Sequence, residues 1–363
     1  IKTDGYQMSE KVRYTITACI SGTACNFDCS YCYRKKQGVE EKNQPSNFRY
    51  SVEYMLKALS KQRLGGIADI VVIGGGETLL HPDVVPFIKG LLAEGHIVEV
   101  VTNMTLNHRI DELLDNTPSE HLERLLVKGS FHYLELKRLN KLDDFFNNMK
   151  KVVDAGASCF PFLVICEEYI PLLDEIKSVF IENLGELPHC TSALDFAEAK
   201  MQPYGFYNNE FKKLVSEKFN SKINDTFDRF LSVDVKNHFC YAGEWSFVLN
   251  TSNGSISRCF YSPSEQNIFR DISSEIKLGA IGTNCCIGNC ALHYNLVSQG
   301  IMPDFDDVVP YGDMLYKPKL FNKKLVELLN FKYENYMPLF SKEEEQKIND
   351  KTRKTFEELK TKV

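Results

Sequence analysis

The chain has 363 residues, of which 43% are hydrophobic and 25% charged, and its formal net charge is −6. This length and composition indicate a folded protein with one large domain and an accessory one. The acidic balance argues against a nucleic-acid partner, whose binding surface is usually basic, and the absence of an apolar run of about 18 residues argues against a membrane span.

Segments rich in apolar residues alternate with helical patterns over the first half of the chain. Most of these segments are continuous apolar runs, which is typical of strands that are buried on both faces of a parallel sheet. The expected strands are residues 13–20, 67–77, 96–103, 125–132, 158–166 and 189–196. The expected helices are residues 51–64, 83–95, 120–125, 142–156 and 171–185.

This alternation predicts the α/β fold class, with a partial (β/α)6 TIM-like barrel in place of the closed barrel of eight repeats. In parallel barrels the chemistry lies on the loops that follow the carboxyl ends of the strands. A cysteine cluster follows the first expected strand, and a GGGE run ends the second. We therefore expect both motifs to belong to one site at this end of the barrel.

The second half of the chain has a different character. The pattern predicts a β-hairpin formed by residues 244–250 and 255–261, with its turn at Asn253-Gly254. The charged sequence from residue 316 onward reads as helix, and we expect it to be a solvated surface helix. The expected domains are residues 1–232, 233–315 and 316–363.

Cysteine is the most informative residue type. The first residues lack the apolar core of a signal peptide, so we expect a cytoplasmic, reducing location in which metal binding or catalysis is favoured over disulfides. The twelve cysteines are Cys19, Cys25, Cys29, Cys32, Cys159, Cys166, Cys190, Cys240, Cys259, Cys285, Cys286 and Cys290.

The first cysteine group is Cys25, Cys29 and Cys32. Three thiolates within eight residues can hold three corners of one [4Fe–4S] cluster, which usually takes four cysteines. The fourth iron would then be open to a chelating ligand, as the open position of a catalytic zinc is. A zinc site or free thiols are the alternatives.

This C-x3-C-x2-C loop resembles that of the radical SAM superfamily. The resemblance implies that the open iron binds the amino and carboxylate groups of S-adenosylmethionine, and that the three cysteines are catalytic. An external one-electron donor such as flavodoxin or ferredoxin would reduce the cluster, cleavage would give a 5′-deoxyadenosyl radical, and this radical would abstract a hydrogen atom from the substrate. Tyr31, before the third cysteine, would pack near the adenine.

The GGGE run resembles the GGE element of the same superfamily. By this resemblance Gly75, Gly76 and Glu77 contact the amino group of S-adenosylmethionine. Glycine permits a close backbone approach to a ligand, and a carboxylate can meet a cationic amine. A tight turn with a surface glutamate is the alternative.

The ends of the third and fourth expected strands carry further polar side chains. These are Thr102 and Asn103, then Ser130 and His132. By the resemblance, these positions touch the ribose and the carboxylate of the cofactor. His132 is equally well explained as a hydrogen-bonded histidine at the mouth of the barrel.

The second cysteine group resembles the opening C-x9–15-G-x4-C pattern of SPASM and Twitch domains, carried here by Cys240, Gly254 and Cys259. Cys290 and either Cys285 or Cys286 would complete an auxiliary [4Fe–4S] cluster. The resemblance thus implies a small Fe–S β-hairpin domain, more like Twitch because it lacks the seven cysteines of a full SPASM domain. A structural zinc site is the alternative.

The sequence leaves the substrate open. Many SPASM and Twitch enzymes modify peptides, which favours a peptide-modifying maturase. Only 24 residues precede Cys25, which suits instead a dehydrogenase or epimerase of a sugar, cyclitol or nucleotide. A non-catalytic Fe–S or zinc scaffold is the remaining hypothesis.

Overall fold

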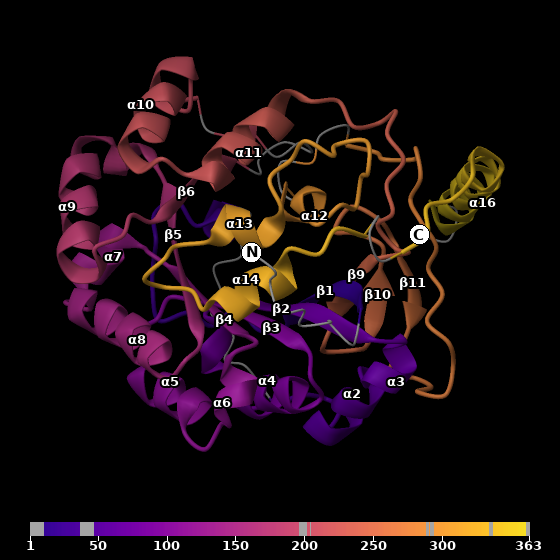
Figure 1. Ribbon diagram of the computed structural model, residues 1–363, viewed down its shortest axis with the longest axis horizontal. Coiled ribbons are helices and arrows are strands. Elements are labelled where there is room, and N and C mark those ends of the chain that lie inside the picture. The colour runs from indigo at the N-terminus through magenta and orange to yellow at the C-terminus, as the bar shows by residue number, and fades with distance from the viewer. Residues whose placement is uncertain are drawn as a thin grey trace, which may run out of the picture.

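The computed structural model describes residues 11–36, 47–195, 202–203, 205–287, 290, 294–333 and 337–360. Its core is a sheet whose first six strands are parallel and follow one another in chain order (Figure 1). These strands are β1 (Val12–Ile20), β2 (Ile67–Gly74), β3 (Ile97–Thr102), β4 (Leu125–Ser130), β5 (Ser158–Ile165) and β6 (His189–Ser192). The predicted partial TIM-like barrel is confirmed.

Helices cover the outer face of these strands, as Figure 1 shows for α4, α5, α8 and α9. Their bounds are α1 Tyr33–Lys36, α2 Val52–Ala58, α3 Lys61–Leu64, η1 Thr78–Leu80, α4 Val84–Ala93, α5 Asn107–Leu114, α6 Ser119–Leu122, α7 Tyr133–Arg138, α8 Leu142–Asp154, η2 Glu167–Leu172, α9 Leu173–Leu184, α10 Asn209–Phe219 and α11 Lys222–Ser232. None of the described helices is both long and apolar enough to span a bilayer.

The segment expected to be one helix over residues 51–64 is divided in two. The hydroxyl of Ser60 accepts a hydrogen bond from the amide of Arg63, so Ser60 is the N-cap of a new helix, α3. The sixth expected strand is also interrupted, because β6 ends at Ser192 and a separate short strand, β7 (Leu194–Asp195), pairs with β8 (Gln202–Pro203). Residue 196 lies outside the described residues.

The predicted hairpin is present and belongs to the same sheet as the barrel strands. Its strands are β9 (Ser246–Asn250) and β10 (Ser255–Ser257), which are antiparallel, and β11 (Ser264–Asn267) extends it. β9 is parallel to β1, with Thr15 opposite Ser246 and Cys19 opposite Asn250. The hairpin is therefore fixed directly to the strand that carries the first cysteine group.

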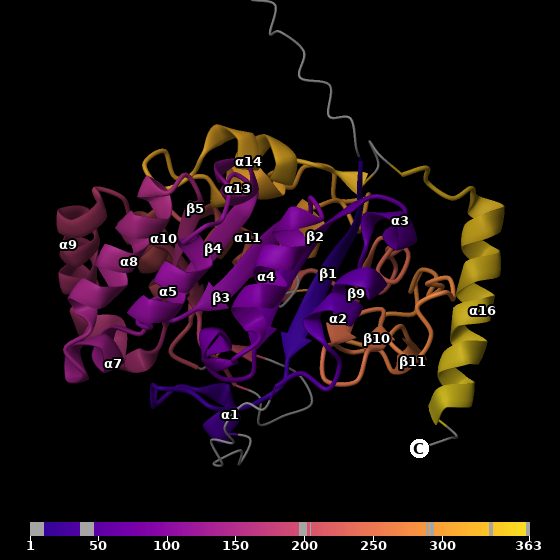
Figure 2. The same cartoon turned by 90° about the horizontal axis from the view of Figure 1, so that it is seen from below.

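The C-terminal segment closes the end of the barrel where the strands begin. Its helices are α12 (Tyr294–Ser298), α13 (Tyr311–Leu315), α14 (Lys323–Leu329) and α16 (Lys342–Lys360). Figure 2 shows α13 and α14 at one end of the strands and α1 at the other. The amide of Cys159 in β5 donates to the carbonyl of Leu320, 2.8 Å away, so this segment hydrogen-bonds to the strands themselves.

A buried polar cluster lies where this segment meets the strands. Glu99 of β3 pairs with Lys128 of β4, and the hydroxyl of Tyr311 lies 3.0 Å from a carboxylate oxygen of Glu99. Gln299 donates to Asp69 of β2 over 2.7 Å. Burial, and then the charge of Glu99, raise the pKa of Asp69 well above its usual range. The neutral form of Asp69 is therefore favoured, and Lys128 balances the charge of Glu99.

We predict that Lys128→Met destabilises the protein by about 3–5 kcal/mol, because it leaves the fully buried carboxylate of Glu99 without its cation. Urea unfolding followed by circular dichroism measures the change. Lys57→Met is the control, since Lys57 is exposed on α2 and should change stability by less than about 0.5 kcal/mol. Equal effects of the two substitutions would contradict the assignment.

Candidate functional site

The first cysteine group lies on the loop that follows β1 and ends at α1. The Cys29 thiol is buried, and burial raises its pKa; the nearby Cys25, Glu135 and Cys32 side chains raise it further. The amide of Cys32 donates to the carbonyl of Cys29 over 3.2 Å, and the amide of Phe27 approaches the sulfur of Cys25 at 3.4 Å. The loop therefore brings the thiols close enough to interact electrostatically.

The residues between these cysteines are held by the loops after the neighbouring strands. The carbonyl of the Asn26 side chain accepts from Asn103 over 2.7 Å, and its amide donates to Thr105 over 3.0 Å. Both partners follow β3. Phe27 is buried and packs edge-on against His132, with 5.7 Å between the ring centres.

Two carboxylates hold the middle of the loop. The amide of Asp28 donates to Glu135 of α7 over 2.7 Å, and the hydroxyl of Ser30 donates to Glu168 over 2.5 Å. Glu135 follows β4 and Glu168 follows β5. Neither residue could be identified from the sequence, because a glutamate in a short charged helix has no local feature that distinguishes it from a surface residue.

Tyr31 and His132, both expected to bind the cofactor, bind each other. The hydroxyl of Tyr31 lies 2.6 Å from Nδ1 of His132. Burial lowers the pKa of His132 to about 4, so the ring is neutral and Nδ1 can accept the phenol proton. Tyr31 also packs edge-on against Tyr169, at 5.8 Å. The aromatic side chain before the third cysteine is thus fixed by the loops after β4 and β5.

The glycine run lies against the backbone of the cysteine loop. A Cβ on Gly76 would lie 2.0 Å from the carbonyl oxygen of Ala24, and one on Gly75 would lie 3.0 Å from that of Gly22. Gly75 is also covered by the guanidinium of Arg34. Only glycine permits this approach at Gly76, because the atoms that it contacts belong to the main chain and cannot turn aside.

Glu77 joins the ends of β2 and β3. Its amide donates to the carbonyl of Ala24 over 2.8 Å. Its carboxylate accepts from the hydroxyl of Thr102 at 2.6 Å and from the amides of Asn103 at 2.7 Å and Leu79 at 2.9 Å. Burial raises the pKa of Glu77, and these hydrogen bonds oppose the rise. The predicted residues Glu77, Thr102 and Asn103 therefore form one buried unit.

A small pocket lies between the cysteine loop and the glycine run, with about 200 Å³ of empty space. Gly22, Ala24, Gly76 and Glu77 line it, together with His81, which is not part of any motif in the sequence. Ser130, the remaining predicted cofactor residue, ends β4 opposite Phe162 of β5 and is half-buried. The predicted residues thus gather at the carboxyl ends of β1 to β4.

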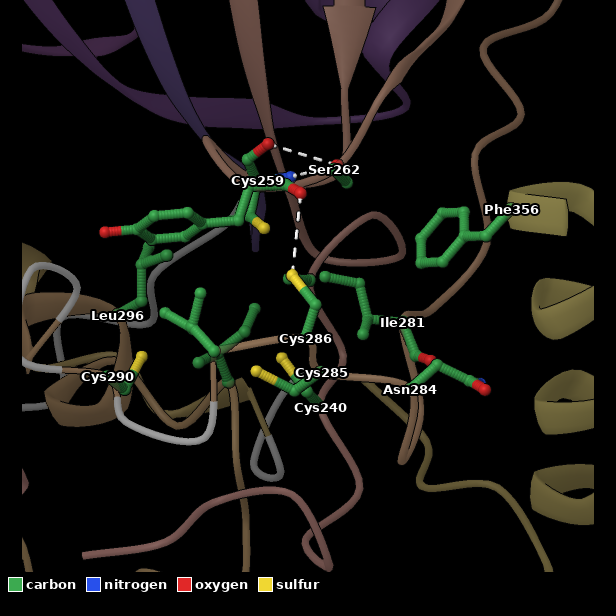
Figure 3. Close-up of a pocket in the computed structure, with 14 residues that line it drawn as sticks. Cys240, Cys259, Ser262, Ile281, Asn284, Cys285, Cys286, Cys290, Leu296 and Phe356 are labelled. Carbon is green, nitrogen blue, oxygen red and sulfur yellow. Dashed lines mark hydrogen bonds between the residues drawn. The ribbon is translucent and has the colours of Figure 1, made fainter. Parts of the chain in front are cut away.

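The second cysteine group lines a separate and larger pocket, with about 540 Å³ of empty space (Figure 3). Cys240 precedes β9, Cys259 follows β10, and the others lie on the segment before α12. The cysteines that line this pocket are Cys240, Cys259, Cys285, Cys286 and Cys290. Within the described ranges, no three side chains of His, Cys, Asp or Glu converge as they would around a single metal ion.

Cys285 and Cys286 lie differently in this pocket. Burial raises the pKa of Cys240 to about 12, and the Cys259 and Cys285 thiols, which line the same pocket, raise it as well. Cys286 is exposed, and its sulfur lies 3.8 Å from the carbonyl oxygen of Tyr261, a contact marked by a dashed line in Figure 3. Cys285 is therefore better placed to act together with Cys240 and Cys259.

The C-terminal helix α16 forms one wall of this pocket, although it was expected to be a solvated helix. Much of it is exposed, but Thr352 is buried, accepts a hydrogen bond from Arg258 at 2.6 Å, and is followed one turn later by Phe356, which lines the pocket. Asn349 accepts from the amide of Thr283 at 2.9 Å. Figures 1 and 2 both place α16 beside the β10–β11 end of the sheet.

Residues 19–168 match the sequence model of the family described as Radical SAM superfamily. This match spans less than half of the chain but includes the first cysteine group and the GGGE run. Proteins of this superfamily use a [4Fe–4S] cluster and S-adenosylmethionine.

Known proteins resemble the chain to different extents. Two proteins of Methanocaldococcus jannaschii, assigned as glycyl-radical enzyme activating enzymes, are 27% and 24% identical to it over 201 and 193 residues. These matches cover 54% and 51% of the chain, and 77% and 66% of the two proteins.

Solved structures share the fold. Streptococcus suis SuiB bound to S-adenosylmethionine has a TM-score of 0.50 at 14% identity, over 71% of this chain and 64% of that one. His-tagged anSMEcpe with bound AdoMet has a TM-score of 0.51 at 16% identity, over 89% of this chain and 93% of that one. The chain thus spans less than two thirds of SuiB.

We predict that Gly76→Ala displaces the cysteine loop, with a loss of about 1–3 kcal/mol of stability and a lower iron content after anaerobic reconstitution. Gly205→Ala is the matched control, because a Cβ at Gly205 meets no atom within 4 Å. Iron analysis and thermal unfolding of both variants test the prediction. Unchanged iron content in Gly76→Ala would show that the close contact with Ala24 does not matter.

Proposed function

We propose that Cys25, Cys29 and Cys32 hold the [4Fe–4S] cluster and leave one iron open for S-adenosylmethionine. When reduced and bound, this group supplies the electron that cleaves S-adenosylmethionine to a 5′-deoxyadenosyl radical, which abstracts a hydrogen atom from the substrate. The observation that carries the proposal is that the loops after β3, β4 and β5 hold all five residues between the cysteines. These residues are Asn26, Phe27, Asp28, Ser30 and Tyr31. An outside one-electron donor would supply the reducing equivalent.

The predicted cofactor residues then fall into two groups by what they do. Gly75 and Gly76 let the main chain of this loop approach a ligand closely. Glu77 already accepts three hydrogen bonds within the protein, so we assign its carboxylate to fixing the ends of β2 and β3 and its backbone to the amino end of the cofactor.

Thr102 ends β3 and Asn103 follows it, and Ser130 ends β4 with His132 two residues later. With Nδ1 of His132 occupied by the phenol of Tyr31, only Nε2 of this ring remains for a ligand. We assign these residues to the ribose and carboxylate of S-adenosylmethionine, with Tyr31 beside the adenine.

For the second group we propose an auxiliary [4Fe–4S] cluster of the SPASM or Twitch type within residues 233–315. Its ligands would be Cys240, Cys259, Cys285 and Cys290. The support is a single pocket that all four line, with apolar walls that include Ile281 and Leu296. An exposed Cys286 whose sulfur faces a carbonyl is the poorer ligand.

We further propose that the substrate is a polypeptide. The curated relatives in Methanocaldococcus jannaschii are assigned to the activation of another enzyme, so their target is itself a protein. Hydrogen abstraction from a side chain or an α-carbon is the corresponding chemistry here. Transfer of deuterium from a labelled peptide into 5′-deoxyadenosine would support this substrate class, and transfer only from a labelled sugar or nucleotide would replace it.

Cys29→Ala should abolish the formation of 5′-deoxyadenosine from S-adenosylmethionine in the presence of dithionite, because the cluster loses a corner ligand. Chromatography with mass detection measures the product. Cys190→Ala is the control, since Cys190 is equally buried but lies within β6, outside both cysteine groups, and this variant should keep the activity. Cleavage by the Cys29→Ala protein would refute the assignment of the site.

Anaerobic reconstitution of the wild-type chain should give about eight irons, four for each cubane. We predict that Cys285→Ala lowers the value to about four, while Cys286→Ala leaves it near eight. Iron and sulfide analysis beside Mössbauer spectroscopy tests this pair. The reverse pattern would exchange the two ligands, and about four irons in the wild type would remove the auxiliary cluster.

A further inference from the structure

A charged pair lies beside the first cysteine loop without being part of any motif. Glu135 lies on α7, and its Oε2 accepts the hydrogen bond from the amide of Asp28, the residue directly before Cys29. The side chain of Glu135 is only 11% exposed. A carboxylate this close to a cluster ligand is costly to bury, so a compensating charge is expected.

Arg138, one turn along α7, supplies that charge. Its Nε donates to Oε1 of Glu135 and its Nη2 to Oε2, each over 2.8 Å. This forked pair lowers the pKa of Glu135, which is therefore ionised at neutral pH. Arg138 itself is 56% exposed and faces solvent on its other side.

The carboxylate lies between the cysteine loop and the guanidinium. Oε2 of Glu135 accepts hydrogen bonds both from the amide of Asp28 and from Nη2 of Arg138. The carboxylate is therefore bonded directly to the cysteine loop, and the guanidinium is joined to the loop through the carboxylate.

The charge of Glu135 and its hydrogen bond with the amide of Asp28 both affect how readily a cluster on this loop accepts an electron. The reduction potential of an Fe–S cluster depends on nearby charge and on hydrogen bonds to its sulfurs. A carboxylate beside Cys29 disfavours the added electron. The amide of Asp28 directs its hydrogen bond to Glu135.

We propose that Glu135 is a positioning residue that lowers the reduction potential of the cluster held by Cys25, Cys29 and Cys32, and that Arg138 limits this effect by partly neutralising it. The inference rests on the proposed function, because it requires a cluster on this loop. A lower potential gives a stronger reductant, which the cleavage of a sulfonium bond demands. Glu135 thereby acts on the reaction without touching S-adenosylmethionine.

The test is a redox titration of the reconstituted protein without S-adenosylmethionine, followed by electron paramagnetic resonance. Glu135→Gln keeps an oxygen that can accept from Asp28 but loses the charge. It should raise the ratio of reduced to oxidised cluster at a fixed potential by on the order of tenfold, or about 59 mV for one electron. Arg138→Gln should change the ratio in the opposite direction.

The opposite signs separate an electrostatic role from a structural one, since a disturbed loop would shift both variants alike. Glu53→Gln is the control, because it removes an exposed carboxylate that is paired with Lys57 on the distant helix α2, and it should leave the potential unchanged. Potentials that are unchanged, or that move in the same direction in both variants, would overturn the inference. Failure of the wild-type chain to form a cluster on this loop would instead overturn the proposed function.

Discussion

The close contact between two stretches of main chain, at Gly76 and Ala24, is the constraint on which the site depends. It places the end of β2 against the loop that follows β1, and the hydrogen bond from the amide of Glu77 to Ala24 fixes the contact. The Glu77 carboxylate then ties this junction to the end of β3. This junction fixes the backbone of the cysteine loop against the end of β2.

At the opposite end of the barrel, buried polar contacts join the C-terminal segment to the strands. Gln299 and Tyr311, from the C-terminal segment, bind Asp69 and Glu99 within the sheet, and Lys128 balances the charge of Glu99. Buried polar groups of this kind require specific partners, so they define one arrangement of the segment against the strands. The same segment continues into α16, which walls the second cysteine pocket.

The sequence predicted what depends on local pattern and missed what depends on distant contacts. Apolar runs of strand length located the six parallel strands, and the spacing of the cysteines located the loop after β1. Glu135 and Glu168 were missed because each contacts the loop across more than 100 residues, with separations of 107 and 138. The wall formed by α16 was missed for a related reason, since a mostly charged helix buries only a few side chains such as Thr352.

The pairing of β9 with β1 has a further consequence for electron transfer. β9 is about 13 Å long. The second cysteine pocket lies at its amino end, and Asn250, which is opposite Cys19 of β1, is its last residue. If both cysteine groups hold clusters, an electron that passed between them would follow two strands that are hydrogen-bonded to each other, with residues 21–24 between β1 and the first cysteine. The tunnelling distance would then be constant through the catalytic cycle, and the transfer rate would not depend on solvent viscosity.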